Sequence, residues 1–196
     1  MRHHEPFLAY EHTATSLCCG HDTIRYINEV NAAMKVEIWS DFISPHCYIG
    51  KRNFELALEK FPQKQYVKVQ YKSFQLVENC KSQAQTLTQL LMDMYDLQFD
   101  EWQQFTKSVC KQAARIGLPM CLEDMKSTCT KDAHRLVKYA EKRGKDLEVV
   151  DLLFRHYFSA QENISDKKIL LAIAKKCGLD EAEVKEVLSF DKYSRA

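Results

Sequence analysis

The sequence predicts an α/β protein in which one strand–helix–strand unit is followed by a long helical region. Three observations support this. An apolar run, Val36–Trp39, precedes a helical pattern that extends to Phe61, and Tyr66–Phe74 then alternates between apolar and polar residues. After Phe74 the apolar residues recur at helical spacing. A strand, a helix and a strand in this order predict two parallel strands.

The junction between the first strand and the first helix carries the candidate catalytic residues. Pro45 suits the first helical position, where its missing N–H is no loss, so Ser44 becomes the N-cap. The Ser44 hydroxyl can then accept from the backbone N–H of Cys47. A helix start favours an anion, and a cysteine there is more readily the reactive thiolate. We therefore take Ser44 and Cys47 as candidate catalytic residues, with Pro45 and His46 completing the motif.

The helical pattern continues through most of the remaining chain. The first helix is expected over Pro45–Phe61. Asp100 and Gly117 are expected to open and close one later helix, and Asp180 with Glu183 predicts a capping box for the last. With these two helices included, the apolar stripes at helical spacing begin near Leu87, Trp102, Ala133, Leu147, Ser165 and Val184. The sum is two strands and about seven helices.

Composition limits the classes of partner. The 28 basic and 27 acidic residues nearly cancel, so charge gives no reason to expect nucleic acid or a membrane surface as a partner. No apolar run approaches the roughly 20 residues of a membrane span, and no signal-peptide pattern is visible. Eight cysteines without an export signal predict reduced thiols in the cytoplasm. Without a C-x-x-C pair, neither a disulfide framework nor a metal site is expected.

We expect three segments along the chain. Residues 1–33 form an N-terminal extension that is expected to be disordered, because its histidines and vicinal cysteines fit no common ligand spacing. Residues 34–80 form the strand–helix–strand half, and residues 81–196 form a helical domain. The residues of the extension that we considered as metal ligands are His3, His4, His12, Cys18, Cys19 and His21.

Two patches of sequence resemble one family. Val36–Phe42 followed by Pro45–Arg52 resembles the active-site region of DsbA-family thioredoxin-fold proteins, the FrnE-like oxidoreductases above all, whose motif is Cys-Pro-x-Cys-Tyr-Ile-Gly-Lys. Asp132–Leu136 resembles a segment of the helical domain inserted in that fold. The resemblance extends from Met34 to Phe190. It implies a thioredoxin-like fold with a helical insert domain, and thiol–disulfide oxidoreductase activity. It also implies that Cys47 matches the second, more buried cysteine of the motif.

Two departures from the family pattern change this expectation. Ser44 stands where the family has its attacking cysteine, and a hydroxyl cannot exchange disulfides, so at most monothiol chemistry at Cys47 is expected. The family also continues into a cis-proline loop, two strands and a helix, whereas this sequence has no proline after Pro119. We therefore expect that part of the fold to be missing from this chain. The first strand would then have an open edge, through which a homodimer is expected.

Three functional hypotheses remain open. The first is a monothiol oxidoreductase that acts on a small thiol, a disulfide or glutathione, with no cofactor except glutathione as a co-substrate. The second rests on Ser44-Pro45, which resembles the Ser-Pro dipeptide that kappa-class glutathione transferases and 2-hydroxychromene-2-carboxylate isomerases have at this place. In those enzymes the serine hydroxyl hydrogen-bonds the glutathione thiolate. The third is a truncated or degenerate relative that acts as a helical binding module. In all three, His46 is expected on the solvent side and His134 in a helix interface.

Overall fold

The computed structural model describes residues 34–78, 85–120, 122–190 and 192–193. The N-terminal extension, with its histidines and its vicinal cysteines, lies outside the described residues. So do Cys80 and Cys121. The prediction of disorder for residues 1–33 and the domain boundary near residue 80 therefore stay predictions.

The strand–helix–strand unit is present as predicted. Strand β1 covers Met34–Ser40, helix α1 covers Pro45–Lys60, and strand β2 covers Val67–Ser73 after a short 3₁₀ turn, η1, at Lys64–Tyr66. The two strands are parallel, and their register pairs Met34 with Val67 and Ser40 with Ser73. Both strands therefore end together, beside the start of α1.

The rest of the described chain is helical, which confirms the change of period after β2. The helices are α2 (Leu87–Tyr95), α3 (Phe99–Arg115), α4 (Lys131–Glu141), α5 (Asp146–Phe154), η2 (Arg155–Ser159), α6 (Lys167–Lys176) and α7 (Glu181–Ser189). Element η2 is a π-helical turn that continues α5. The single stripe expected from Leu147 to Phe158 is therefore an α-helix that widens in its last turn, a feature often found at functional sites.

Two helix starts differ from the predicted ones. Helix α3 is capped by Gln98, whose capping box uses Glu101, and not by Asp100. Helix α6 is capped by Asp166 and not by Ser165. At α3 the Glu101 side chain accepts from the Gln98 N–H, and at α6 the Asp166 side chain accepts from the Lys168 N–H. Sequence patterns place helix ends only to within a few residues, because neighbouring polar residues compete for the cap.

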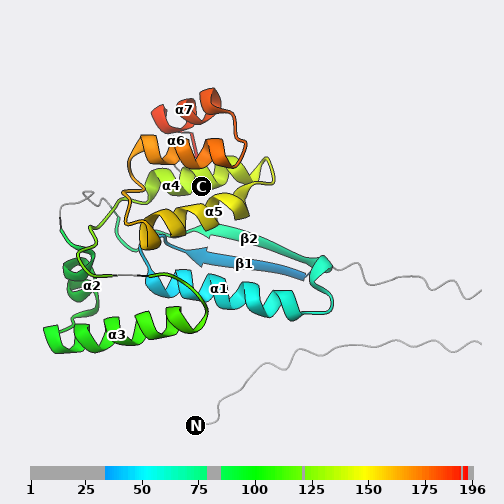
Figure 1. Cartoon of the computed structure of the whole chain (residues 1–196). Coiled ribbons are helices and arrows are strands. Elements are labelled where there is room, and N and C mark those ends of the chain that lie inside the picture. Colours follow the sequence, from blue (N-terminus) through cyan, green and yellow to red (C-terminus); the bar gives the residue numbers. More distant parts are fainter. Residues whose placement is uncertain (1–33, 79–84, 121, 191, 194–196) are drawn as a thin grey trace, which may run out of the picture. The chain divides into compact units, whose positions relative to one another are not determined.

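The core lies between the start of α1 and the later helices. Helix α1 runs along one face of the two-stranded sheet, and α4 and α5 lie over the other face (Figure 1). The Tyr48 ring of α1 stacks on Phe154 and Phe158, at centroid distances of 5.2 and 5.6 Å. All three side chains are at most 2% exposed. The aromatic stack therefore fixes the first turns of α1 against α5 and its π-helical turn.

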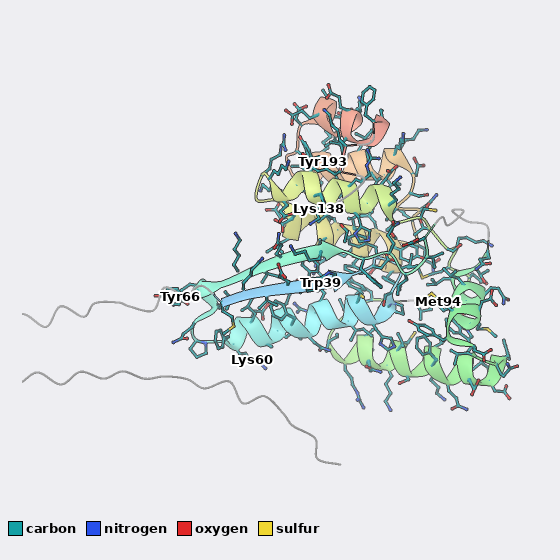
Figure 2. All side chains as sticks on the ribbon, turned by 180° about the vertical axis from the view of Figure 1, so that it is seen from behind. Trp39, Lys60, Tyr66, Met94, Lys138 and Tyr193 are labelled. Carbon is teal, nitrogen blue, oxygen red and sulfur yellow. The ribbon has the colours of Figure 1, made fainter. Side chains whose placement is uncertain are left out.

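The outer edge of β1 has no strand partner among the described residues. Within the described residues, β1 pairs only with β2. Trp39, near the end of β1, is 60% exposed (Figure 2). An unpaired strand edge is a template for pairing with another chain. The homodimer through this edge stays a prediction.

The helices also bear on membrane association. Among the described residues, no helix is long and apolar enough to cross a bilayer.

Candidate active site

The Ser44 cap has the predicted geometry. Ser44 has extended backbone angles, φ −88° and ψ 115°, and Pro45 follows it at the start of α1. The backbone N–H of Cys47 donates to Oγ of Ser44 at 3.2 Å. The Ser44 N–H itself donates to the carbonyl of Asp41, also at 3.2 Å, which closes a tight turn after β1. Ser44 and Cys47 therefore share the first turn, as the sequence indicates.

The two candidate catalytic residues differ in accessibility. Ser44 is 5% exposed, whereas Cys47 is half-buried and packs against the hydrophobic core. The resemblance implied the opposite order, with the residue at position 47 the more buried. In the described structure Cys47 is therefore the more accessible group for a substrate.

His46 lies on the solvent side of the first turn, as expected. It is exposed, and its ring meets Phe105 of α3 edge-on, with a centroid distance of 5.4 Å and an angle of 82° between the planes. This contact joins the start of α1 to the middle of α3. Within the described residues, His46 makes no polar contact to Ser44 or Cys47.

A buried acid at the end of β1 is a site residue that the sequence reading missed. Asp41 is 1% exposed, and its Oδ2 accepts from the Leu76 N–H at 2.7 Å. Its Oδ1 lies 3.4 Å from Nε2 of His134 on α4, and neither atom makes a hydrogen bond within the described part of the chain. The His134 ring also packs on Phe42 at 4.8 Å. His134 is therefore an interface residue, as expected, but one that faces the turn before Ser44.

A second polar cluster lies further along α1. Lys51 is 5% exposed, and its Nζ donates to Glu55 at 2.5 Å and to Asp151 of α5 at 2.7 Å. Burial raises the pKa of Tyr71, and the charges of Glu55, Asp151 and Cys47 raise it further. The charges of this cluster and of Cys47 therefore both act on the pKa of Tyr71, which lies on β2. Lys51 is part of the quoted motif, but its partner Asp151 is 100 positions away, so no local pattern could pair the two residues.

The remaining described cysteines correct one expectation. Cys129 is disulfide-bonded, so the prediction that all eight cysteines are reduced thiols is wrong. Cys177 is 4% exposed, and burial, with a smaller contribution from Glu148, raises the pKa of its thiol. It is therefore a packing residue, as its apolar stripe indicated. The cytoplasmic location rested on reduced thiols and stays a prediction.

The site combines a thiol, a hydroxyl and a buried acid. In the described ranges, no group of three or more His, Cys, Asp and Glu side chains is arranged to hold a metal ion. What the site provides is a half-buried thiol in the first turn of α1, a capping hydroxyl beside it, and a buried acid beneath the turn.

The comparisons with known proteins identify the family. A family model described as a DSBA-like thioredoxin domain matches residues 35–196. This chain therefore belongs to the DsbA-like thioredoxin-domain family, which confirms the resemblance to the DsbA family and the fold class. The similarity to the FrnE-like oxidoreductases stays a prediction. A solved structure of a probable DsbA oxidoreductase from Streptomyces coelicolor is 33% identical, with a TM-score of 0.74 over 82% of this chain and 70% of that chain.

Two further similarities are more distant. A 2-hydroxychromene-2-carboxylate isomerase structure shares the fold, with a TM-score of 0.57 and 13% identity over 81% of this chain and 72% of that chain. The uncharacterized protein YwbO of Bacillus subtilis is 24% identical over 159 residues, which are 81% of this chain and 73% of YwbO.

Proposed function

We propose that this DsbA-like protein is a thiol-dependent oxidoreductase in which Cys47 reacts and Ser44 positions the helix start. The observation that carries the proposal is the half-buried Cys47 thiol in the first turn of α1, next to a serine whose oxygen binds the Cys47 N–H. The unpaired N–H groups of a helix start stabilise a thiolate, which is the attacking form. The similarity to a probable DsbA oxidoreductase supports the same class of reaction.

The proposed reaction is thiol–disulfide exchange with one protein thiol. The Cys47 thiolate attacks one sulfur of a small disulfide, the disulfide bond of the substrate breaks, and the other half leaves as a thiolate. A second small thiol, such as glutathione, then attacks the mixed disulfide. This step frees Cys47 and forms the new disulfide. Each exchange breaks one disulfide and forms one, so no further oxidant or reductant is needed.

The first experiment tests whether Cys47 forms the mixed disulfide. Intact-mass and peptide analysis after incubation with glutathione disulfide should find one glutathionyl group on Cys47. The modification should be absent in Cys47→Ala and unchanged in Cys110→Ser, a control at another half-buried cysteine. Modification of other cysteines with none on Cys47 would contradict the proposal.

The second experiment restores the family motif. The Ser44→Cys variant would place two cysteines in the first turn, three residues apart. We expect it to gain insulin-reducing activity that the unchanged protein lacks, because the second thiol can resolve the mixed disulfide. The Ser44→Cys/Cys47→Ala variant is the matched control and should not show this gain. If Ser44→Cys alone gains no activity, the geometry does not support a redox-active pair.

A second candidate function uses Ser44 in place of Cys47. The Ser44 hydroxyl accepts from Cys47 but donates to no group in the described residues, so its proton is available for a glutathione thiolate. This would make the protein a glutathione-dependent transferase or isomerase. The burial of Ser44 weighs against this function, because a side chain that is only 5% exposed is hard for glutathione to reach. Saturable glutathione binding that is lost in Ser44→Ala and retained in Cys47→Ala would favour it.

The third hypothesis, a helical binding module without catalysis, is decided by the same experiments. If glutathione disulfide leaves Cys47 unmodified and glutathione does not bind, both catalytic proposals fail and this hypothesis replaces them.

A further inference from the structure

We propose that a second site, next to the candidate active site, binds a small carboxylic acid. A pocket of about 250 Å³ opens between α1, the loop Gly117–Pro119 and the end of α5 with its π-helical turn. We call it the α1 pocket. The proposal does not depend on thiol chemistry at Cys47.

The floor of the α1 pocket is a charge network. Lys51 donates to both Glu55 and Asp151, and Nε of Arg155 lies 2.7 Å from Oδ2 of Asp151. Both carboxylates therefore already have cationic partners. These partners offset their negative charge and reduce their attraction for a cationic ligand. A ligand of the opposite charge has to be considered instead.

The rim of the pocket supplies unused cationic donors. Arg155 uses Nε toward Asp151, and its two terminal nitrogens make no hydrogen bond within the described residues. Nη1 of Arg52 lies 3.7 Å from Glu55 and 3.9 Å from Glu59, both too long for hydrogen bonds. The lining contains three cations and two carboxylates, so the lining itself has a net charge of +1, with Glu59 just outside it beside Arg52. A guanidinium fork matches the two oxygens of a carboxylate.

A tyrosine side chain also lines the pocket. Tyr48 is only 2% exposed, and its hydroxyl makes no hydrogen bond within the described part of the chain. The hydroxyl oxygen is not one of the buried polar atoms without a partner, so it is accessible to water or to a ligand. The ring stacks on Phe154 and Phe158, which holds Tyr48 in place. A ligand in the pocket would give the hydroxyl a partner without moving the ring.

The charges also select among anions. Glu55 and Asp151 would repel a doubly charged group such as a phosphate monoester, whereas one carboxylate matches the net charge of +1 on the lining. Leu118 and Pro119 add apolar lining for the body of such a ligand. The chemical class is therefore a small monocarboxylic acid with an apolar body.

The test uses benzoate, with benzamide as an uncharged molecule of the same shape. In ¹⁵N-labelled full-length protein, benzoate should give saturable shifts of the Gly117 and Arg155 amide signals, and benzamide should not. The Arg52→Gln/Arg155→Gln variant should bind benzoate at least tenfold more weakly. Tyr48→Phe should reduce the affinity for benzoate by less, because the positive charges remain. Arg143→Gln is the matched control, since Arg143 pairs with Glu183 away from the pocket, and should leave binding unchanged.

Several outcomes would overturn the proposal. One is the absence of saturable shifts at these two amides. A second is equal binding of benzamide. A third is an Arg143→Gln variant that weakens benzoate as much as the double variant. Inorganic phosphate serves as a further probe, and tighter binding of phosphate than of benzoate through the same arginines would show that the ligand class is wrong.

Discussion

Nε2 of His134 lies 3.4 Å from Oδ1 of Asp41, which directly follows β1 and lies three residues before Ser44. Asp41 is 1% exposed and His134 is 6% exposed. Asp41 also accepts from the Leu76 N–H after β2, so one carboxylate contacts both strand ends and α4. The turn that presents Ser44 is therefore held from beneath by a side chain of the helical region.

The first prediction concerns the coupling between these two residues. Asp41→Asn should destabilise the protein by about 1–3 kcal/mol, because it weakens a buried polar contact and leaves His134 without its acidic partner. His134→Gln should cost a similar amount. In a double-mutant cycle by chemical denaturation, the coupling energy should be at least about 0.5 kcal/mol.

An exposed pair provides the control for this cycle. Lys145 and Glu148 form an i,i+3 ion pair with side chains 41% and 56% exposed, so the Lys145→Gln/Glu148→Gln cycle should give a coupling near zero. If the Asp41–His134 cycle gives the same small value, the two residues are neighbours without an energetic link.

The sequence predicted contacts between residues that are close along the chain, but not contacts between distant residues. The Ser44 cap could be predicted because a residue at an N-cap and the N–H three residues later are brought together by helix geometry alone. Asp41 and His134 both lie in patches that resemble the family, yet no rule of spacing joins a strand end to a distant helix. The pair of Lys51 with Asp151 was missed for the same reason.

Two other features could not be predicted from the sequence. The π-helical turn at Arg155–Ser159 has the same apolar stripe as an ordinary helix, so hydrophobic periodicity does not reveal it. The Cys129 disulfide was missed because isolated cysteines carry no pairing information without a fold.

The second prediction tests the Ser44 cap. Ser44→Ala removes the acceptor of the Cys47 N–H and should lower the free energy of unfolding by about 1 kcal/mol. The matched control is Ser108→Ala, at an exposed position inside α3, which should change stability by less than about 0.5 kcal/mol. Denaturant midpoints measured at constant slope compare the two. Equal effects would mean that the cap does not stabilise α1.

The third prediction compares two described cysteines. Cys47 is half-buried in the first turn of α1, whereas Cys177 is 4% exposed and burial raises the pKa of its thiol. In the native protein, iodoacetamide should therefore modify Cys47 faster than Cys177, and mass spectrometry of the peptides gives both rates. Denaturant should remove the difference. If both react equally fast without denaturant, the helices around Cys177 do not protect it.

The fourth prediction concerns the buried cation of the α1 pocket. Lys51→Met should destabilise the protein by roughly 1–3 kcal/mol, less than the 3–5 of a fully buried pair, because Glu55 and Asp151 are about one-third exposed. Lys35→Met is the control: the Lys35–Glu37 pair lies at the surface, with Lys35 52% exposed, and its loss should cost less than about 1 kcal/mol. A Lys51→Met cost no larger than that of the control would show that the charge network does not stabilise the fold.

The last prediction follows the alkaline limb of the stability curve. The Tyr139 hydroxyl of α4 donates to Glu183 of α7 at 2.6 Å, and burial together with this bond raises the pKa of Tyr139 to about 12. The unfolded chain titrates near 10, so the folded state holds this proton more tightly. The stabilisation is fully present below pH 10 and is lost as the pH rises through about 12.

Tyr139→Phe removes this titration and leaves the ring in place. The variant should be less stable than the unchanged protein at neutral pH, because the bond to Glu183 is gone. Its stability should then fall less steeply between pH 10 and pH 12, as measured by denaturant midpoints at several pH values. Tyr66→Phe, at a 45%-exposed tyrosine, is the control and should keep the original slope. If the slope of Tyr139→Phe equals that of the control, Tyr139 does not link α4 to α7 through its proton.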